Sequence, residues 1–282
     1  MSIPPLAART TAGSWPEGPL RVVVLTCGTP GDASGFESAR AIAQVPGVDV
    51  VAIAVSPHRR PRGVRARLRQ VYRRRGIPGL IGIPARKLAA MLRRTTVDAA
   101  VESAPAGVPS LALDDFHAEA SLAALRALAP DLAVIDGTYI LKESVFSLPR
   151  LGAINLHCGR LPEYRGAPPA FWELYNGERE VGVTVHWVTA GVDEGPIIRQ
   201  ELVPLDPAPA GDPMRVVHEI WRDTLRPIGV RLLAEAVAAI AAGNGEGRRQ
   251  NPADGRTYRF PDYSTVRELR ARVADRRRAA RR

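Results

Sequence analysis

The stretch LRVVVLTCG, residues 20–28, is a continuous run of mostly apolar, often β-branched residues that ends at a glycine. Such a run is typical of a parallel strand buried on both faces, because a half-exposed strand alternates apolar and polar residues. The next stretch, SGFESARAIAQVPG, has helical spacing and a Pro-Gly stop, and VDVVAIAVS at 48–56 is a second buried strand. This β-α-β order predicts a parallel sheet with right-handed crossovers.

The same rhythm returns after residue 106 and predicts an α/β fold, a mostly parallel sheet with helices on both faces. We expect strands at 107–113, 131–137, 153–157, 181–188 and 197–205. We expect helices at 117–130, 143–152, 168–177 and 212–243. Pro227 is expected to kink the last of these or to mark the junction of two helices.

Three segments lie outside this pattern. Residues 1–19 are expected to form a flexible leader before a catalytic domain at 20–243, and residues 244–282 a basic C-terminal tail, helical or disordered. The segment at about 57–95 is a basic helical insertion, dense in arginine before a break at Ile77–Pro78–Gly79. Its simpler interpretation is a solvated helical face, and the alternative is a lid that binds anions.

The composition narrows the class of protein. The formal net charge is +10, almost all of it from arginine, which favours anionic partners but also fits a genome rich in arginine codons. Two cysteines cannot form a disulfide framework, and no His/Cys cluster has zinc-site spacing, so no metal is expected. No secretory signal or membrane-spanning run is visible, so the expected location is the cytoplasm.

Polar side chains gather where the 153–157 strand ends. Asn155 and His157 are two residues apart in an otherwise apolar strand, so alternation places both on one face. Asp193 lies between two glycines in the turn after the next long strand, and we expect it to reach His157 because adjacent strands end side by side. An amide, an imidazole and a carboxylate beyond a strand end suit acyl transfer to an amine through a tetrahedral intermediate.

No serine or cysteine stands in a nucleophile elbow, which favours direct transfer from an activated donor. Cys158 points to the face opposite His157 and is interpreted as packing, with a nucleophile as the alternative. His186, inside the 181–188 strand, is interpreted as structural. Asp131 and Asp136 are interpreted as cap or turn residues, with a supporting role at the site left open.

Three separated motifs resemble those of the formyltransferase family. They are Asn155–Leu156–His157, Leu161–Pro162 through Gly166, and Asp193–Glu194–Gly195, in the family's order. The resemblance covers roughly residues 20–243 and is strongest over 136–200. It implies a Rossmann-like fold and N10-formyltetrahydrofolate as the formyl donor.

The resemblance also implies roles for individual residues. Asn155 would stabilise the oxyanion, His157 would assist proton transfer, and Asp193 would position the histidine and relay the amine proton through water. The folate pterin would lie against Ile140, Leu141, Ala190, Gly191 and Val192.

The loop after His157 departs from the family pattern, because Cys158–Gly159–Arg160 replaces the usual Pro-Ser-Leu. The catalytic trio is retained, so the departure affects loop shape and acceptor contacts. We name as candidate acceptor-binding residues Gly28, Thr29, Arg160, Tyr164 and Arg165. For the two loop arginines a surface ion pair is an equal alternative.

The acceptor is expected to be a small amine, such as a nucleotide-linked amino sugar or a natural-product amine. Residues 27–35, CGTPGDASG, resemble the tRNA-type and sugar-type members, and the phosphate loop of the purine-pathway enzyme is missing. The tail lacks the alternating strands of the barrel that tRNA-type members carry. The alternatives are a formyltetrahydrofolate hydrolase and, in another class, a nucleic-acid-binding protein that uses the insertion and tail. A homodimer through the long amphipathic helix or the aromatic tail patch is left open.

Overall fold

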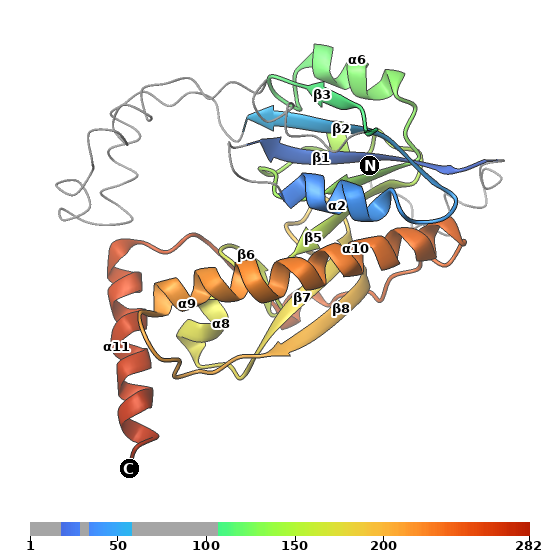
Figure 1. The fold of residues 1–282 in the computed structure, drawn as a ribbon. Coiled ribbons are helices and arrows are strands. Elements are labelled where there is room, and N and C mark those ends of the chain that lie inside the picture. Colours follow the sequence, from blue (N-terminus) through green and yellow to red (C-terminus); the bar gives the residue numbers. More distant parts are fainter. Residues whose placement is uncertain (1–17, 29–33, 58–106) are drawn as a thin grey trace.

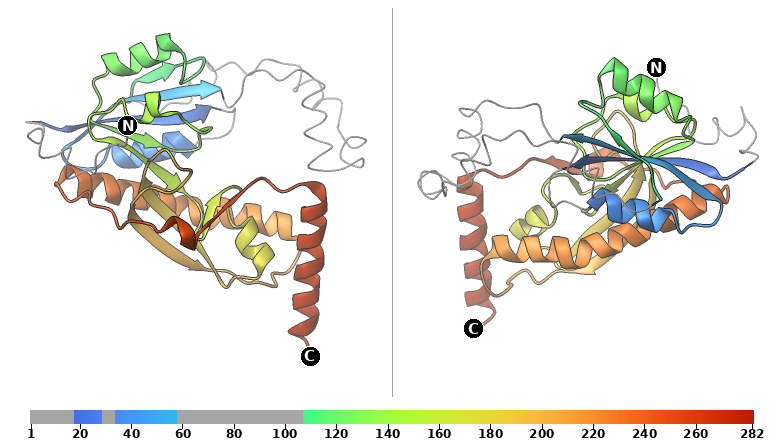
Figure 2. Two further views of the ribbon diagram at one scale, coloured as in Figure 1. Left: turned by 180° about the vertical axis from the view of Figure 1, so that it is seen from behind. Right: turned by 45° about the horizontal axis from the view of Figure 1, so that its top comes forward.

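A computed structural model describes residues 18–28, 34–57 and 107–282. The expected leader and basic insertion lie almost entirely outside these residues. The described chain contains a seven-stranded sheet in the order β3-β2-β1-β4-β5-β7-β8, and a second, two-stranded sheet of β6 and β9. Helices cover both faces of the large sheet (Figures 1 and 2), so the expected Rossmann-like α/β fold is confirmed.

The strands are β1 (Leu20–Gly28), β2 (Val48–Pro57), β3 (Ser110–Ala112), β4 (Leu132–Ile135), β5 (Gly152–His157), β6 (Tyr164–Gly166), β7 (Glu180–Trp187), β8 (Ile197–Pro204) and β9 (Arg256–Tyr258). The α-helices are α2 (Ser34–Ile42), α6 (Glu119–Ala127), α7 (Glu143–Phe146), α8 (Phe171–Asn176), α9 (Pro213–Ile220), α10 (Arg226–Ala241) and α11 (Tyr263–Ala279). A π-helical turn, Trp221–Leu225, joins α9 to α10, and Pro227 lies in the first turn of α10, where its missing N–H costs little. None of the described helices is long and apolar enough to cross a bilayer.

The central strands are buried on both faces, as their continuous apolar runs predict. Alternate residues of each strand enter two separate cores. On one face, Val22, Val24 and Ile154 pack in a core with α2 and α10. On the other, Val23 and Ala153 pack in a core with α6 and α7. Two covered faces explain why these strands are apolar throughout.

The sheet changes direction between β5 and β7. Strands β1 to β5 run parallel, whereas β7 runs antiparallel to β5 and β8 antiparallel to β7. The register of β5 and β7 places Asn155 opposite His186 and His157 opposite Thr184. Directly opposite residues in an antiparallel pair point to the same face, so this register places His186 beside Asn155.

The C-terminal segment packs on the domain. Strand β9 pairs in parallel with β6, and α11 lies against α8 and α9 (Figure 1). Leu269 and Val273 of α11 are fully buried, and Arg276 donates to the carbonyl of Leu174 at the end of α8. We expected either a basic helix or a disordered arm here, and the segment forms a docked basic helix preceded by a short strand.

A buried ion pair joins the sheet to the helices on one face. Asp136, which follows β4, accepts hydrogen bonds from Arg226 Nη1 at 2.9 and 3.1 Å and from the Ser38 hydroxyl at 2.6 Å. Asp136 and Arg226 are 3% and 7% exposed, so Arg226 compensates the buried Asp136 charge, and the guanidinium also lies 3.6 Å from the more exposed Glu37 carboxylate. The cap or turn role expected for Asp136 is therefore wrong, because sequence spacing could not show that α10 delivers an arginine to the end of β4.

Breaking this pair should be costly. Asp136→Asn should lower the free energy of unfolding by roughly 3–5 kcal/mol, because it removes the buried carboxylate that faces Arg226 and leaves the more exposed Glu37, 3.6 Å from the guanidinium, as a weaker counter-charge. Chemical denaturation measures the change. The matched control is Asp212→Asn, which removes the carboxylate from an exposed pair with Arg270 and should cost less than about 1 kcal/mol. Equal losses in the two variants would contradict the importance of burial.

Candidate functional site

The candidate site lies where the carboxyl end of β5 meets the turn that follows β7. Asn155 is half-buried and His157 is 8% exposed, and both project from the face of β5 that carries Ala153. His157 Nε2 lies 2.7 Å from the carbonyl oxygen of Tyr164. Since a carbonyl only accepts, this contact places a proton on Nε2 and leaves Nδ1 facing the site.

His186 joins this group from the neighbouring strand. Its Nε2 lies 3.2 Å from Asn155 Nδ2, and its Nδ1 lies 2.8 Å from the carbonyl oxygen of Trp187. The carbonyl places a proton on Nδ1, so Nε2 faces both the Asn155 amide and Asp193; it accepts from the amide when the ring is neutral and carries a proton toward Asp193 when the ring is charged. His186 therefore contacts the site and is more than the structural residue that the sequence indicated.

Asp193 lies between the two histidines. Its Oδ2 is 3.5 Å from His157 Nδ1, its Oδ1 is 3.4 Å from His186 Nε2, and Oδ2 also accepts the Gly166 N–H at 2.8 Å. The expected contact with His157 is present, but the reason that we gave for it is wrong. Because β7 is antiparallel to β5, their C-terminal ends do not meet, and the turn after β7 folds back across the sheet face instead.

The surroundings of Asp193 keep its carboxyl ionised. Burial alone would raise its pKa, but the charge of His157, the contact with His186 and the Gly166 N–H together hold the pKa well below its ordinary value. A carboxylate that stays ionised at neutral pH can stabilise a positive charge on a neighbouring imidazole or on a reacting amine.

The loop at 158–160, where the chain departs from the family pattern, packs directly on His157. A Cβ atom added at Gly159 would lie 2.4 Å from His157 Nε2 and 2.8 Å from the Tyr164 carbonyl oxygen. Glycine is therefore required for this loop to pass the imidazole. The residues that replace the family's Pro-Ser-Leu, Cys158–Gly159–Arg160, therefore affect the position of the His157 ring as well as the shape of the loop.

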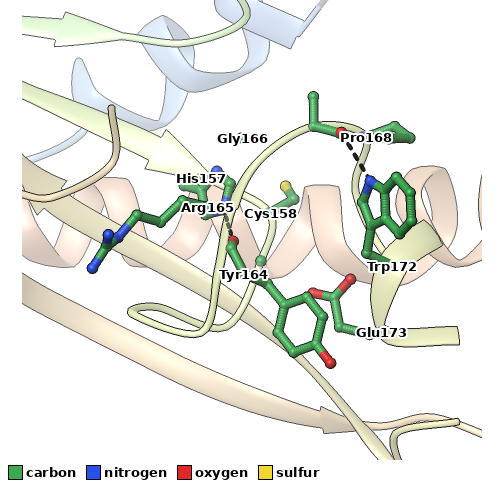
Figure 3. Close-up of a pocket in the computed structure, with 10 residues that line it drawn as sticks. His157, Cys158, Tyr164, Arg165, Gly166, Pro168, Trp172 and Glu173 are labelled. Atoms are coloured by element: carbon green, nitrogen blue, oxygen red, sulfur yellow. Dashed lines mark hydrogen bonds between the residues drawn. The ribbon is translucent and has the colours of Figure 1, made fainter. Parts of the chain in front are cut away.

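A small cavity of about 10 Å³, roughly the space that one water needs, opens beside this loop (Figure 3). His157, Cys158, Trp172 and Glu173 are among the residues that line it.

Burial raises the pKa of the Cys158 thiol to about 12, which supports packing over a nucleophilic role. Glu173 is 2% exposed, burial raises its pKa to about 7, and its Oε1 has no hydrogen-bond partner among the described residues.

The loop residues proposed for the acceptor have protein partners. Arg160 lies 3.8 Å from a Glu163 carboxylate oxygen and 3.6 Å from one of Glu178, and Arg165, which is 4% exposed, lies 3.3 Å from Glu194. For Arg160 and Arg165 we had set an ion pair beside acceptor binding as an equal alternative, and the structure shows ion pairs for both. Tyr164 donates to Glu178 at 2.8 Å and, with burial as the main cause, has a raised pKa.

The expected folate-binding residues lie on the segments that follow β4 and β7. Leu141 is buried in the core that carries Ala153, and Val188 packs against the same core, so the segments after β4 and β7 share one hydrophobic cluster. Ile140 is 76% exposed, which leaves an uncovered apolar side chain at this edge. Of the segment at 190–192, Ala190 is exposed and the other two residues are half-buried. Among the acceptor candidates, Gly28 ends β1 and Thr29 lies outside the described residues.

Comparison with known proteins identifies relatives of part of the chain. A model of the formyl transferase family matches residues 86–216. A methionyl-tRNA formyltransferase of Parabacteroides distasonis is 40% identical over 137 residues, which cover 49% of this chain and 40% of that protein. The chain thus spans about two fifths of the length of the curated relatives that it matches.

Solved structures share the fold across most of the chain. A sugar N-formyltransferase from a Shewanella species aligns with a TM-score of 0.53 and 15% identity, over 86% of this chain and 77% of its own. A sugar 3N-formyltransferase, crystallised in the presence of dTDP and 5-N-formyltetrahydrofolate, aligns with a TM-score of 0.51 and 12% identity, over 85% and 69% of the two chains. At these identities the likeness concerns the fold alone.

The tight packing at Gly159 predicts that Gly159→Ala displaces the His157 ring and breaks its hydrogen bond to Tyr164. Overpacking of this kind should also lower the free energy of unfolding by roughly 1–3 kcal/mol. NMR of the His157 side-chain nitrogens and chemical denaturation measure the two effects. Gly18→Ala is the control, since nothing lies within 4 Å of its added Cβ. An unchanged His157 signal in Gly159→Ala would contradict the packing.

The raised pKa of Glu173 predicts a pH-dependent stability. The folded state binds this proton more tightly than the unfolded state, so stability falls as pH rises from the ordinary pKa of 4.5 to about 7. Glu173→Gln removes this loss and should raise the free energy of unfolding at pH 8 by up to about 3 kcal/mol, but little at pH 4. Denaturation at both pH values measures it. The exposed Glu246→Gln is the control, and equal gains at both pH values in Glu173→Gln would contradict the assignment.

Proposed function

We propose that the chain acts as a member of the formyltransferase family and transfers a formyl group from N10-formyltetrahydrofolate to the amine of a small acceptor. The observation that supports this most strongly is the Asp193 carboxylate, paired with His157 and His186 beside the Asn155 amide. An oxyanion donor, a proton-handling ring and a base lie together, which is the set that formyl transfer requires.

In the proposed reaction the amine attacks the formyl carbon, forming a new C–N bond and a tetrahedral oxyanion. Asn155 donates to this oxyanion, its amide being oriented by His186. The Asp193 carboxylate stabilises a positive charge on His157 and relays the proton that the amine loses through water, and His157 assists this transfer. When the intermediate collapses, the bond from carbon to N10 breaks, and N10 takes a proton, so that the amine proton ends on the released tetrahydrofolate.

The donor is proposed from the family and from the solved relative crystallised in the presence of 5-N-formyltetrahydrofolate. In this chain Ile140 offers an uncovered apolar side chain for the flat pterin, and the 190–193 turn offers backbone groups close to Asp193. These residues would hold the donor with its formyl group toward Asn155.

Two classes of acceptor are supported. A nucleotide-linked amino sugar or a natural-product amine remains the main proposal, and two solved sugar N-formyltransferases share the fold. The second class is the amine of an aminoacyl-tRNA. The Parabacteroides distasonis relative is a methionyl-tRNA formyltransferase, and α11 carries arginines in its last turn that could pair with phosphates.

The proposal predicts tetrahydrofolate release when the protein is given N10-formyltetrahydrofolate and its acceptor. The panel should contain nucleotide-linked amino sugars, N-hydroxy-ornithine and methionyl-tRNA. Asn155→Ala should reduce the rate roughly 10²–10³-fold by removing an oxyanion donor, and His157→Ala roughly 10²–10⁴-fold. Asp212→Asn, which lies on the exposed surface, should keep the wild-type rate.

Three results would redirect the proposal. A near-full rate in Asn155→Ala or His157→Ala would contradict the assigned roles. Equal release of tetrahydrofolate and formate without any amine would identify a hydrolase. RNA binding that weakens steeply with salt, in a protein that releases no tetrahydrofolate with any amine, would favour the nucleic-acid-binding alternative.

A further inference from the structure

The turn that carries Asp193 has an unfavourable backbone conformation. Asp193 has a φ of +55°, in the left-handed region that costs a residue with a side chain roughly 1–2 kcal/mol. The turn is also tight, since a Cβ added at Gly195 would lie 1.7 Å from the carbonyl oxygen of Trp187. Such a conformation persists only where surrounding contacts hold it.

Gln250, from the C-terminal segment, contacts this turn directly. Its side-chain nitrogen donates to the carbonyl oxygens of Asp193 at 2.9 Å and of Gly195 at 2.6 Å. An amide nitrogen has two hydrogens, so one side chain can bridge both carbonyls. Gln250 therefore holds the backbone on both sides of Glu194.

The segment before Gln250 is itself fixed to the start of β8. Ile197 and Arg248 exchange two backbone hydrogen bonds of 2.8 Å, and Trp187 Nε1 donates to the carbonyl of Gly245 at 2.8 Å in a buried position. Beyond Gln250, strand β9 pairs with β6, which supplies the Gly166 N–H to Asp193. The C-terminal segment thus reaches both sides of the Asp193 carboxylate.

We propose that Gln250 is a positioning residue that holds the Asp193 turn and so keeps the carboxylate between His157 and His186. This inference rests on the proposed function for its catalytic consequence. Residue 250 lies outside the part of the chain that the family model matches, and strand β8 and helices α9 and α10 separate it from Asp193 in the sequence.

The test is Gln250→Glu, which keeps the shape of the side chain but removes both donors, and Gln250→Met, which removes them without adding charge. With the turn released, kcat should fall roughly 10²-fold with KM little changed, since misplacing a reacting group by about 1 Å has an effect of this size. The acid limb of the pH–rate profile should move to higher pH, because Asp193 loses the contacts that lower its pKa. The matched control is Asn251→Asp, the same amide-to-acid change one residue further on, whose side chain bonds to Ala253 and Asp254 and to nothing at the Asp193 turn among the described residues.

A second measurement does not depend on activity. Carbon-13 NMR of the Asp193 carboxyl, without any substrate, should show its titration moving toward an ordinary aspartate in both Gln250 variants and staying in place in Asn251→Asp. If the wild-type protein transfers no formyl group, this measurement still tests the inference. A folded Gln250→Met protein with the wild-type Asp193 titration would overturn it, whatever the activity.

Discussion

The site depends on one carboxylate held between two histidines. Each histidine has its far ring nitrogen fixed by a backbone carbonyl, Tyr164 for His157 and Trp187 for His186, so each presents its other nitrogen toward Asp193. Fixed rings are important because a proton can be passed efficiently only along a defined direction. The Asp193 carboxylate is in turn kept ionised by these neighbours, which links the charge of the site to its geometry.

This arrangement follows from a change in strand direction. Asn155 and His157 lie at the end of a parallel strand, the usual place for a ligand site in an open α/β sheet. The antiparallel partner β7 then sets His186 opposite Asn155, and the turn after β7 folds back to bring in Asp193. The mixed sheet therefore brings these site residues together on one face. In a purely parallel sheet they would lie at the ends of separate strands.

Much of this could be predicted from the sequence. Apolar runs marked the strands, because burial on both faces requires them, and alternation placed Asn155 and His157 on one face. His186 was missed because its role depends on the register of β7 against β5, which periodicity does not encode. Its position in VTVHWV, on the same face as Thr184 and opposite to Val183 and Val185, is the only local signal. Gln250 gave no local signal. A polar residue in a Gly-rich tail has the same sequence pattern whether its side chain faces solvent or binds a turn.

Backbone carbonyls fix both histidines around Asp193. Nitrogen-15 NMR of the histidine side chains at neutral pH tests it most directly, since the shifts distinguish protonated from unprotonated ring nitrogens. The account predicts a proton on Nε2 of His157 and a proton on Nδ1 of His186. A His186 ring protonated only on Nε2, or a His157 ring protonated only on Nδ1, would contradict it.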